Sequence, residues 1–300
     1  MKIREILEWL DMNEVSYYSG GDENAEINSF SSLSNYKPGS VTWIKKQDNY
    51  DKAGRPVNIS LAVIQSDCNV DFDNYISCEN SKEVFFAILH HFWGKKMKNG
   101  FVGEGTVTVG VVDISPEAYI GYNCSLVGNI KIGARTVIEN NVSITGDVII
   151  GNDCHIQSGV VIGIDGFGYS RDSVSGRKAM IEHFGGVRIG NDCFIGSHTN
   201  IARGTIDDTV IGNGVKIAPS THIGHNNIIE DDATVICSNL FGSVHTGAEA
   251  YIVSSTIENQ RNVGANTVIG MGSVVDSDIP DNVIAYGTPA KVRRENNSGL

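Results

Sequence analysis

One histidine of this 300-residue chain stands in a setting that predicts acid–base chemistry. His225 lies in the segment Ile223-Gly-His-Asn226. Histidine titrates close to neutral pH, and a well-placed general base contributes roughly 10²–10⁴-fold to a rate. Such a base takes the proton that an attacking nucleophile loses. The competing interpretation is a surface histidine satisfied by solvent.

Two polar neighbours extend this hypothesis. Asn226 follows His225 directly and is expected to orient the base or the substrate. His222 lies three residues earlier on an outward position, where it is expected to contact the substrate.

A six-residue repeat must position these residues. An apolar residue recurs at every sixth position, with interruptions, at Ile120, Leu126, Ile132, Ile138, Ile144, Ile150, Ile156, Ile162, Ile189, Ile195, Ile201, Ile211, Ile217, Ile223, Ile229, Val235, Phe241, Val263, Ile269 and Val275. The fifth residue of the hexads is small or branched at Cys124, Thr136, Val142, Cys154, Val160, Cys193, Thr199, Val215, Thr221 and Ala233. His225 occupies the third position of its hexad, near a corner.

This pattern predicts a parallel β-helix over residues 101–277. Three short strands form one coil, each strand places one large and one small side chain inward, and stacked coils bury a continuous core. A period of six does not keep one face of an α-helix, and the runs are rich in β-branched residues. Cys124, Cys154 and Cys193 occupy the small inward position, so we interpret them as reduced core residues.

Two breaks in the repeat are informative. Residues 163–188 form a long glycine-rich insertion with the aromatics Phe167, Tyr169 and Phe184, and loops of this length usually have a function. We expect this loop to dock on a partner, such as a neighbouring subunit. The second break is a shift of phase over residues 202–210.

The segments before and after the repeat lack its six-residue pattern. Residues 1–100 are predicted to form a small α/β domain with strand-like runs at 40–44 and 59–64. One helix buries Ile3, Ile6, Leu7 and Leu10, and another, capped by Ser81, buries Val84, Phe85, Ile88, Leu89 and Phe92. Residues 278–300 form a short tail that carries basic side chains.

Composition excludes several classes of function. A net charge of −12 argues against a nucleic-acid partner, because binding phosphates requires a basic face. No apolar run approaches the roughly 18 residues of a membrane span, and the N-terminal residues lack the features of a secretory signal. We therefore expect a cytoplasmic protein without a transmembrane segment.

The motifs around both breaks resemble those of one enzyme family. The segments are Gln157-Ser-Gly-Val-Val-Ile-Gly-Ile-Asp-Gly-Phe-Gly-Tyr169, Arg203-Gly-Thr-Ile-Asp-Asp-Thr-Val-Ile-Gly-Asn-Gly214 and Ile223-Gly-His-Asn226. They are similar in order and spacing to those of UDP-3-O-acylglucosamine N-acyltransferase, the third enzyme of lipid A synthesis. The resemblance implies a left-handed β-helix, a homotrimer with active sites between subunits, and a uridine-binding N-terminal domain.

The same resemblance implies roles for further residues. His225 matches the catalytic base, and an amide of Gly242 or Ser243 is expected to hold the oxyanion. Trp43 aligns with an aromatic that stacks on uracil, and Tyr50 is a candidate for a second one. Gln260 stands where the family has a substrate-binding histidine.

The acyl donor is a thioester, of acyl carrier protein or of coenzyme A, and no tightly bound cofactor is expected. The end of the chain, Ile269 to Arg294, is similar to the tails of acetyl-CoA-dependent sugar acetyltransferases. This similarity favours the alternative of an N-acetyltransferase that acts on a UDP- or dTDP-linked amino sugar for O-antigen or another surface glycan. Lys291, Arg293 and Arg294 are expected to contact a coenzyme A phosphate or an acidic carrier protein.

Two alternatives belong to other classes. The gamma-class carbonic anhydrases bind zinc with three histidines on a β-helix, which makes His222, His225 and His245 a conceivable zinc site. Their spacing differs from that pattern, so we expect no metal. A catalytically silent β-helix used for binding is the other alternative.

Overall fold

A computed structural model describes residues 1–56, 58–68, 72–94 and 99–296, so the last four residues of the expected tail lie outside the described part. The chain divides into two compact units, residues 1–96 and 97–300. No helix of the described residues is long and apolar enough to cross a membrane.

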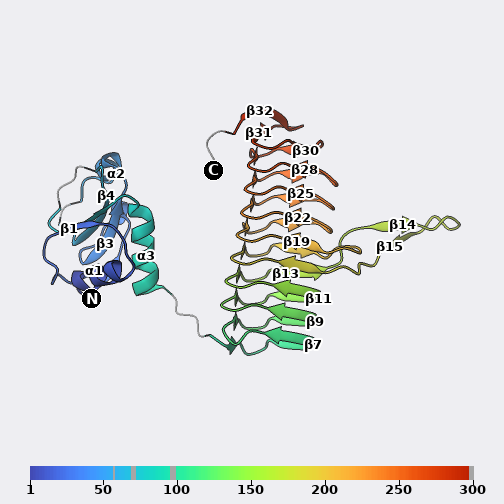
Figure 1. Cartoon of the computed structure of the whole chain (residues 1–300), viewed down its shortest axis with the longest axis horizontal. Coiled ribbons are helices and arrows are strands. Elements are labelled where there is room, and N and C mark those ends of the chain that lie inside the picture. Colours follow the sequence, from blue (N-terminus) through green and yellow to red (C-terminus); the bar gives the residue numbers. More distant parts are fainter. Residues whose placement is uncertain (57, 69–71, 95–98, 297–300) are drawn as a thin grey trace. The chain divides into compact units, whose positions relative to one another are not determined.

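The first unit is a five-stranded sheet covered by helices (Figure 1). Its helical elements are α1 (Ile3–Met12), η1 (Leu33–Asn35), α2 (Gln47–Lys52) and α3 (Ser81–Trp93). The strands, in sheet order, are β1 (Tyr18–Gly20), β5 (Tyr75–Cys78), β4 (Leu61–Gln65), β3 (Ser40–Ile44) and β2 (Ser29–Phe30). Only the β1–β5 pair is antiparallel.

The apolar faces of the helices account for this packing. The four residues predicted for the first helix, Ile3, Ile6, Leu7 and Leu10, are all buried in α1. The prediction that Ser81 caps α3 is wrong, because Asn80 is the N-cap residue and Ser81 is already helical. The Ser81 hydroxyl instead donates to Gln65 Oε1 at 2.8 Å and accepts a hydrogen bond from Trp43 Nε1 at 2.9 Å.

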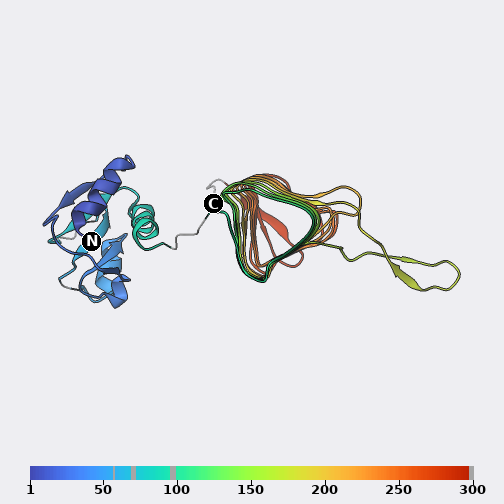
Figure 2. The same cartoon turned by 90° about the horizontal axis from the view of Figure 1, so that it is seen from below.

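The second unit is a parallel β-helix with a triangular cross-section, which Figure 2 shows end-on. One face is a sheet of, in order, β6 (Phe101–Val102), β8 (Tyr119–Ile120), β10 (Val137–Ile138), β12 (His155–Ile156), β17 (Phe194–Ile195), β20 (Lys216–Ile217), β23 (Thr234–Ile236), β26 (Tyr251–Val253), β29 (Val268–Ile269), β31 (Val283–Tyr286) and β32 (Lys291–Glu295). Only β32 runs antiparallel to its neighbour, so β31 adds a parallel strand beyond residue 277.

A second sheet forms the other two faces. Its long strands β7 (Val107–Ile114), β9 (Ser125–Ile132) and β11 (Ser143–Ile150) contribute to both faces. Beyond β11, the second face consists of β13 (Val161–Ile164), β18 (Asn200–Ala202), β21 (His222–Ile223), β24 (Asn239–Leu240), β27 (Thr256–Ile257) and β30 (Val274–Val275). The third consists of β16 (Val187–Ile189), β19 (Thr209–Ile211), β22 (Ile228–Ile229), β25 (His245–Thr246) and β28 (Asn262–Val263).

The predicted inward column is confirmed with one exception. Its isoleucines and valines form a continuous buried core along the β-helix, and Cys124, Cys154 and Cys193 are buried free thiols within it. Phe241 was expected inside but is 43% exposed, because Leu240 occupies the inward position. The step between the inward residues Val235 and Leu240 is five residues instead of six, and Cys237 adopts a left-handed φ of 44° at the tightened corner.

The breaks in the repeat gather on one edge of the β-helix, between its second and third faces. The long insertion joins β13 to β16 and carries the hairpin β14 (Tyr169–Arg171) and β15 (Lys178–Met180), which projects away from the coils (Figure 1). The phase shift joins β18 to β19 on the same edge, and His225 lies between β21 and β22 on the next coil. We call this the broken edge.

Candidate functional site

His225 is half-buried at the broken edge, with its ring held by a neutral partner. Its Nδ1 lies 3.0 Å from Asn226 Oδ1. A carboxamide oxygen only accepts hydrogen bonds, so Nδ1–H is the donor and Nε2 carries the lone pair. The ring is therefore in the tautomer that a general base requires.

Asn226 is fixed in turn by the phase-shifted segment. Its Oδ1 also accepts hydrogen bonds from the Thr205 amide (3.0 Å) and hydroxyl (2.8 Å), and its Nδ2 donates to Asp207 O at 2.9 Å. Its own amide donates to Thr209 Oγ1 at 2.9 Å. These contacts leave the side-chain oxygen and nitrogen of Asn226 only one orientation, so the phase shift sets the His225 tautomer.

The lone pair of His225 opens onto a small pocket. The cavity has a volume of about 310 Å³ and is lined by Gly166, Phe167, His222, Gly224, His225, Phe241, Gly242 and Asn259. Gly242, on the next coil, leaves the space beside this nitrogen open, because a Cβ at this position would lie 2.5 Å from His225 Nε2.

His222 lines the same pocket from β21. Its Nδ1 lies 3.0 Å from Asn200 Oδ1, so Nδ1–H donates and Nε2 is an acceptor. Burial, followed by the charge of nearby His225, lowers the pKa of His222 below its ordinary value. The structure therefore brings this predicted substrate contact together with His225 as a neutral ring.

The two amides predicted to hold an oxyanion are both engaged within the protein. Gly242 N donates to Asn259 Oδ1 at 2.8 Å, and Ser243 N donates to His225 O at 2.7 Å. An oxyanion reaches either N–H only by displacing its acceptor. Gln260 lies on the following coil, where it is exposed and its amide donates to Gly242 O at 2.9 Å. It does not line the pocket, whereas its neighbour Asn259 does.

Several residues of the site were not singled out as site residues from the sequence. Phe167 and Asn259 line the pocket, and His183 lies next to His225 with their ring centroids 5.3 Å apart. A histidine inside a glycine-rich insertion was the only sequence signal for His183, since polar loop residues often have a function. Asn259 gave no such signal, because asparagine is frequent at the corners of these coils.

The three histidines weighed as a zinc site do not converge. His245 lies on β25, where its Nε2 is 2.8 Å from Glu230 Oε1. Across the part of the chain that the structure describes, no group of three or more His, Cys, Asp or Glu side chains is arranged to hold a metal ion.

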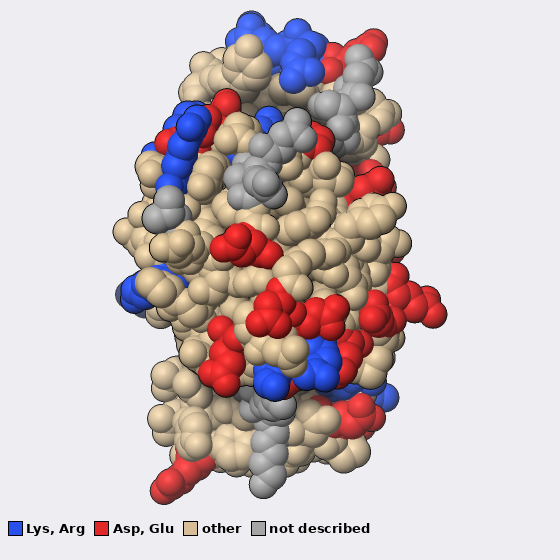
Figure 3. Space-filling view, turned by 90° about the vertical axis from the view of Figure 1, so that its left-hand side faces the viewer, with Lys and Arg blue, Asp and Glu red and all other residues tan. Residues whose placement is uncertain are grey.

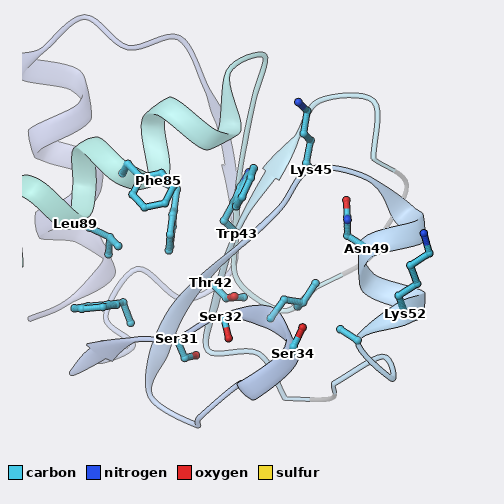
Figure 4. Close-up of a pocket in the computed structure, with 14 residues that line it drawn as sticks. Ser31, Ser32, Ser34, Thr42, Trp43, Lys45, Asn49, Lys52, Phe85 and Leu89 are labelled. Atoms are coloured by element: carbon cyan, nitrogen blue, oxygen red, sulfur yellow. The ribbon is translucent and has the colours of Figure 1, made fainter. Parts of the chain in front are cut away.

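The first unit has a larger pocket of about 590 Å³ between its sheet and α3 (Figure 4). Trp43 lines it beside Phe85 and Phe86, with ring centroids at 6.4 and 6.3 Å. Lys45 and Lys52 line its rim and are exposed. The buried hydroxyl of Thr42 also belongs to the lining and has no hydrogen-bond partner among the described residues.

Tyr50, the second predicted stacking aromatic, does not line this pocket. Its ring packs edge-on against Phe72 at 5.4 Å, and its hydroxyl donates to Pro56 O at 3.1 Å. Asn49 lines the pocket instead. The structure therefore does not bring Tyr50 together with Trp43 in this pocket, whereas the residue before it on α2 lines the cavity.

The basic residues of the tail lie on β32, at the end of the β-helix. Lys291, Arg293 and Arg294 are all exposed, and Arg293 Cζ lies 5.1 Å from the centre of the Tyr286 ring. Figure 3 shows Lys and Arg side chains gathered at this end, with acidic side chains beside them. The structure does not bring these residues together with His225, which lies several coils away on another edge.

Comparison with known proteins places the repeat in a class. Residues 129–163 match the family described as bacterial transferase hexapeptide (six repeats). Among solved structures, LpxA from Acinetobacter baumannii has a TM-score of 0.57 at 24% identity, over 65% of this chain and 75% of that one. The Francisella novicida UDP-N-acetylglucosamine acyltransferase gives a TM-score of 0.56 at 24% identity, covering 65% and 72%. This likeness shows the fold, which is the predicted left-handed β-helix of hexapeptide transferases.

The sequence comparisons define the family. The UDP-3-O-acylglucosamine N-acyltransferase of Coxiella burnetii is 32% identical over 299 residues, which cover 92% of this chain and 86% of that protein. The chain belongs to the UDP-3-O-acylglucosamine N-acyltransferase family. The enzyme of the same name from Bordetella parapertussis is 38% identical over 126 residues, a match that spans 41% of this chain and 35% of the Bordetella protein.

Proposed function

We propose that the protein transfers an acyl group from a thioester to the amine of a nucleotide-linked amino sugar, with His225 as general base. The amine nitrogen attacks the thioester carbon, a C–N bond forms, and the carbonyl electron pair moves to oxygen. His225 Nε2 takes the proton from nitrogen. The intermediate then collapses, the C–S bond breaks, and the thiolate leaves and accepts the proton from His225.

The observation that carries this proposal is the free lone pair of His225 in its pocket. Asn226 directs Nε2 toward the cavity, and Gly242 keeps the approach to it open. His222 offers a second acceptor to a substrate hydroxyl or amine. No covalent acyl-enzyme is required, because none of the pocket-lining residues is a cysteine or serine. Membership of the N-acyltransferase family supports the same chemistry.

The pocket of the first unit fits a nucleobase. Trp43 presents an aromatic surface for stacking, which contributes about 1–3 kcal/mol per base in other proteins. The unpartnered Thr42 hydroxyl offers a hydrogen bond to a base edge, and Lys45 and Lys52 carry the charge that a diphosphate requires. A UDP- or dTDP-linked sugar combines these groups.

The acyl donor that we propose is a thioester of coenzyme A or of acyl carrier protein. The exposed cations of β32 support an acidic partner, either a coenzyme A phosphate or an acyl carrier protein. A short acyl-CoA makes the protein an N-acetyltransferase of surface-glycan synthesis, and a long-chain acyl carrier protein makes it an enzyme of lipid A synthesis.

A homotrimer is the assembly we propose, as expected from the family. The exposed aromatics of the long insertion support an intersubunit contact: Phe167 is 80% exposed and Phe184 is 71% exposed. Burying such rings on a neighbouring subunit removes apolar area from water. Sedimentation equilibrium of the full chain tests this, and a monomer at micromolar concentration contradicts it.

Turnover assays separate the remaining possibilities. Thiol release is measured from acetyl-CoA and from a long-chain acyl carrier protein, each against UDP- and dTDP-linked amino sugars. We expect release that depends on both substrates and forms an amide product. Absence of turnover with every pair contradicts the catalytic proposal and favours a β-helix used only for binding.

A further inference from the structure

His183 has a buried nitrogen whose role the proposed reaction does not explain. The side chain is 2% exposed, and its Nδ1 lies 2.9 Å from Ile181 O. A carbonyl only accepts, so Nδ1–H donates and Nε2 carries a lone pair. That Nε2 has no hydrogen-bond partner among the described residues. A buried acceptor without a partner lowers stability, so its presence calls for an explanation.

The unpaired nitrogen stands beside His225. The two rings meet at 73° with centroids 5.3 Å apart. Gly166 packs against both: a Cβ added to it would lie 2.7 Å from His225 Cδ2 and 2.9 Å from His183 Nε2. The lone pair of His183 and the Cδ2 edge of His225 thus border one small space, which a glycine leaves open.

This arrangement favours one protonation state of His225. When Nε2 of His225 takes a proton, positive charge spreads over the ring, including the adjacent Cδ2–H edge. A lone pair at that edge attracts the new charge, and burial strengthens the attraction by excluding water. The neutral ring gains much less, so the interaction grows as the proton is transferred.

We propose that His183 is a positioning residue for acyl transfer, whose Nε2 lone pair stabilises the protonated ring of His225. The inference rests on the proposed role of His225 as base. The inference also gives the long insertion a role besides the intersubunit contact, because Gly166 precedes β14 and His183 follows β15. Both ends of the insertion hold the base, so its conformation is coupled to proton transfer.

Three variants of the full chain test this role. His183→Gln keeps an acceptor at the end of the side chain, whereas His183→Leu has a similar volume without one. Gly166→Ala leaves His183 unchanged and inserts a methyl group between the two rings. Each is assayed for thiol release with the donor and amino-sugar nucleotide that the unaltered chain uses, and melting temperatures report folding.

We expect His183→Leu to lower kcat roughly 10-fold with KM within about twofold, because the lone pair acts on the transition state and does not touch substrate. His183→Gln should recover most of kcat, and Gly166→Ala should lower it even if His183→Leu fails to fold. Equal losses in the Gln and Leu variants assign His183 to packing alone and overturn the inference, as does full activity in His183→Leu and Gly166→Ala.

The His225→Ala variant distinguishes the proposed role of His225 as base from the proposed role of His183. If this variant is inactive while the His183 and Gly166 variants are fully active, the base assignment stands and the role of His183 is wrong. If His225→Ala retains full turnover, or if the unaltered chain has none, the proposed function fails and takes the inference with it.

Discussion

Two histidines of the regular coils, His155 and His245, differ from His225 at the broken edge in the hydrogen-bond partner of the ring. His155 on β12 and His245 on β25 each place Nε2 2.8 Å from a glutamate oxygen, of Glu139 and Glu230 respectively. The second oxygen of each glutamate accepts a backbone amide hydrogen bond, from Ser158 or Ala248. In these two coils the imidazole Nε2 is therefore paired.

At the broken edge the pairing is different. His225 is oriented by neutral Asn226 through Nδ1, and its Nε2 faces a pocket. His183, whose ring lies beside that of His225, has an Nε2 without a hydrogen-bond partner among the described residues. The comparison teaches that a glutamate occupies the Nε2 position of His155 and His245, whereas Nε2 has no such partner in His225 and His183 beside the insertion and the phase shift.

The largest expected effect comes from replacing His225 by alanine, with the same replacement of a regular-coil histidine as the control. His225→Ala is expected to lower kcat by about 10²–10⁴-fold, because the base is lost. His245→Ala, the matched change in a regular coil, should leave kcat within about twofold. Steady-state thiol release measures both, and equal losses would break the comparison.

A methyl group at the pocket is expected to act next most strongly. Gly242→Ala places a Cβ 2.5 Å from His225 Nε2, so the ring must move or the approach closes. We expect kcat to fall by about 10²-fold. Gly168→Ala is the control, since its nearest heavy atom would be 3.9 Å away. A Gly242→Ala enzyme with full activity shows that Nε2 is not the reacting atom.

The Asn226→Ala variant tests whether the phase-shifted segment fixes the tautomer of His225. Asn226→Ala removes the side-chain contacts to His225, Thr205 and Asp207, and leaves the ring without a fixed tautomer. We expect a roughly 10-fold loss of kcat and a decrease of about 1–3 kcal/mol in the free energy of unfolding, measured with urea. Asn141→Ala, at a regular corner with φ 58° against 57° for Asn226, controls for backbone strain. Similar losses in the two variants would assign Asn226 to the corner alone.

A change in the first unit is expected to affect nucleotide affinity and not the acyl-transfer step. Trp43→Ala should weaken binding of UDP to the full chain by about 1–3 kcal/mol through lost stacking. Tyr50→Leu removes the ring that packs against Phe72 outside this pocket and should leave affinity nearly unchanged. Isothermal titration calorimetry separates the two, and a larger effect at Tyr50 would restore the role predicted from sequence.

The smallest expected effect is a dependence of stability on pH. Burial and the charge of His225 lower the pKa of His222, so the unfolded chain binds its proton more readily than the folded one. The contribution of His222 to stability is therefore present above about pH 6.5, the ordinary value of histidine, and is lost as pH falls. Urea unfolding between pH 5 and 8 should show a shallower acid dependence for His222→Gln. An unchanged slope contradicts the assignment.

Much of the fold could be predicted because it is periodic. The inward column and the small fifth position depend on local alternation, which the sequence displays directly, and the core residues followed from it. The prediction that Phe241 points inward failed because a one-residue contraction at Cys237 moves Leu240 inward, and the sequence does not mark a shortened coil.

The site was predictable only where its residues lie in one motif. His225, Asn226 and His222 occupy one coil, and the roles proposed for them followed from their spacing and from the family resemblance. His183 and Asn259 come from an insertion and from a later coil, so their approach depends on how the chain folds back. Engagement of the Gly242 and Ser243 amides is likewise a property of stacked corners.

The most direct test is the protonation of the His225 ring nitrogens. A ¹⁵N spectrum of histidine-labelled full chain at pH 8, with the signal assigned by comparison with His225→Gln, reports which nitrogen carries hydrogen. We predict a protonated Nδ1 and an unprotonated Nε2, because Asn226 Oδ1 accepts from Nδ1. Asn226→Ala should give a mixture of tautomers. A proton on Nε2 in the unaltered chain would leave the pocket without a base and contradict the account.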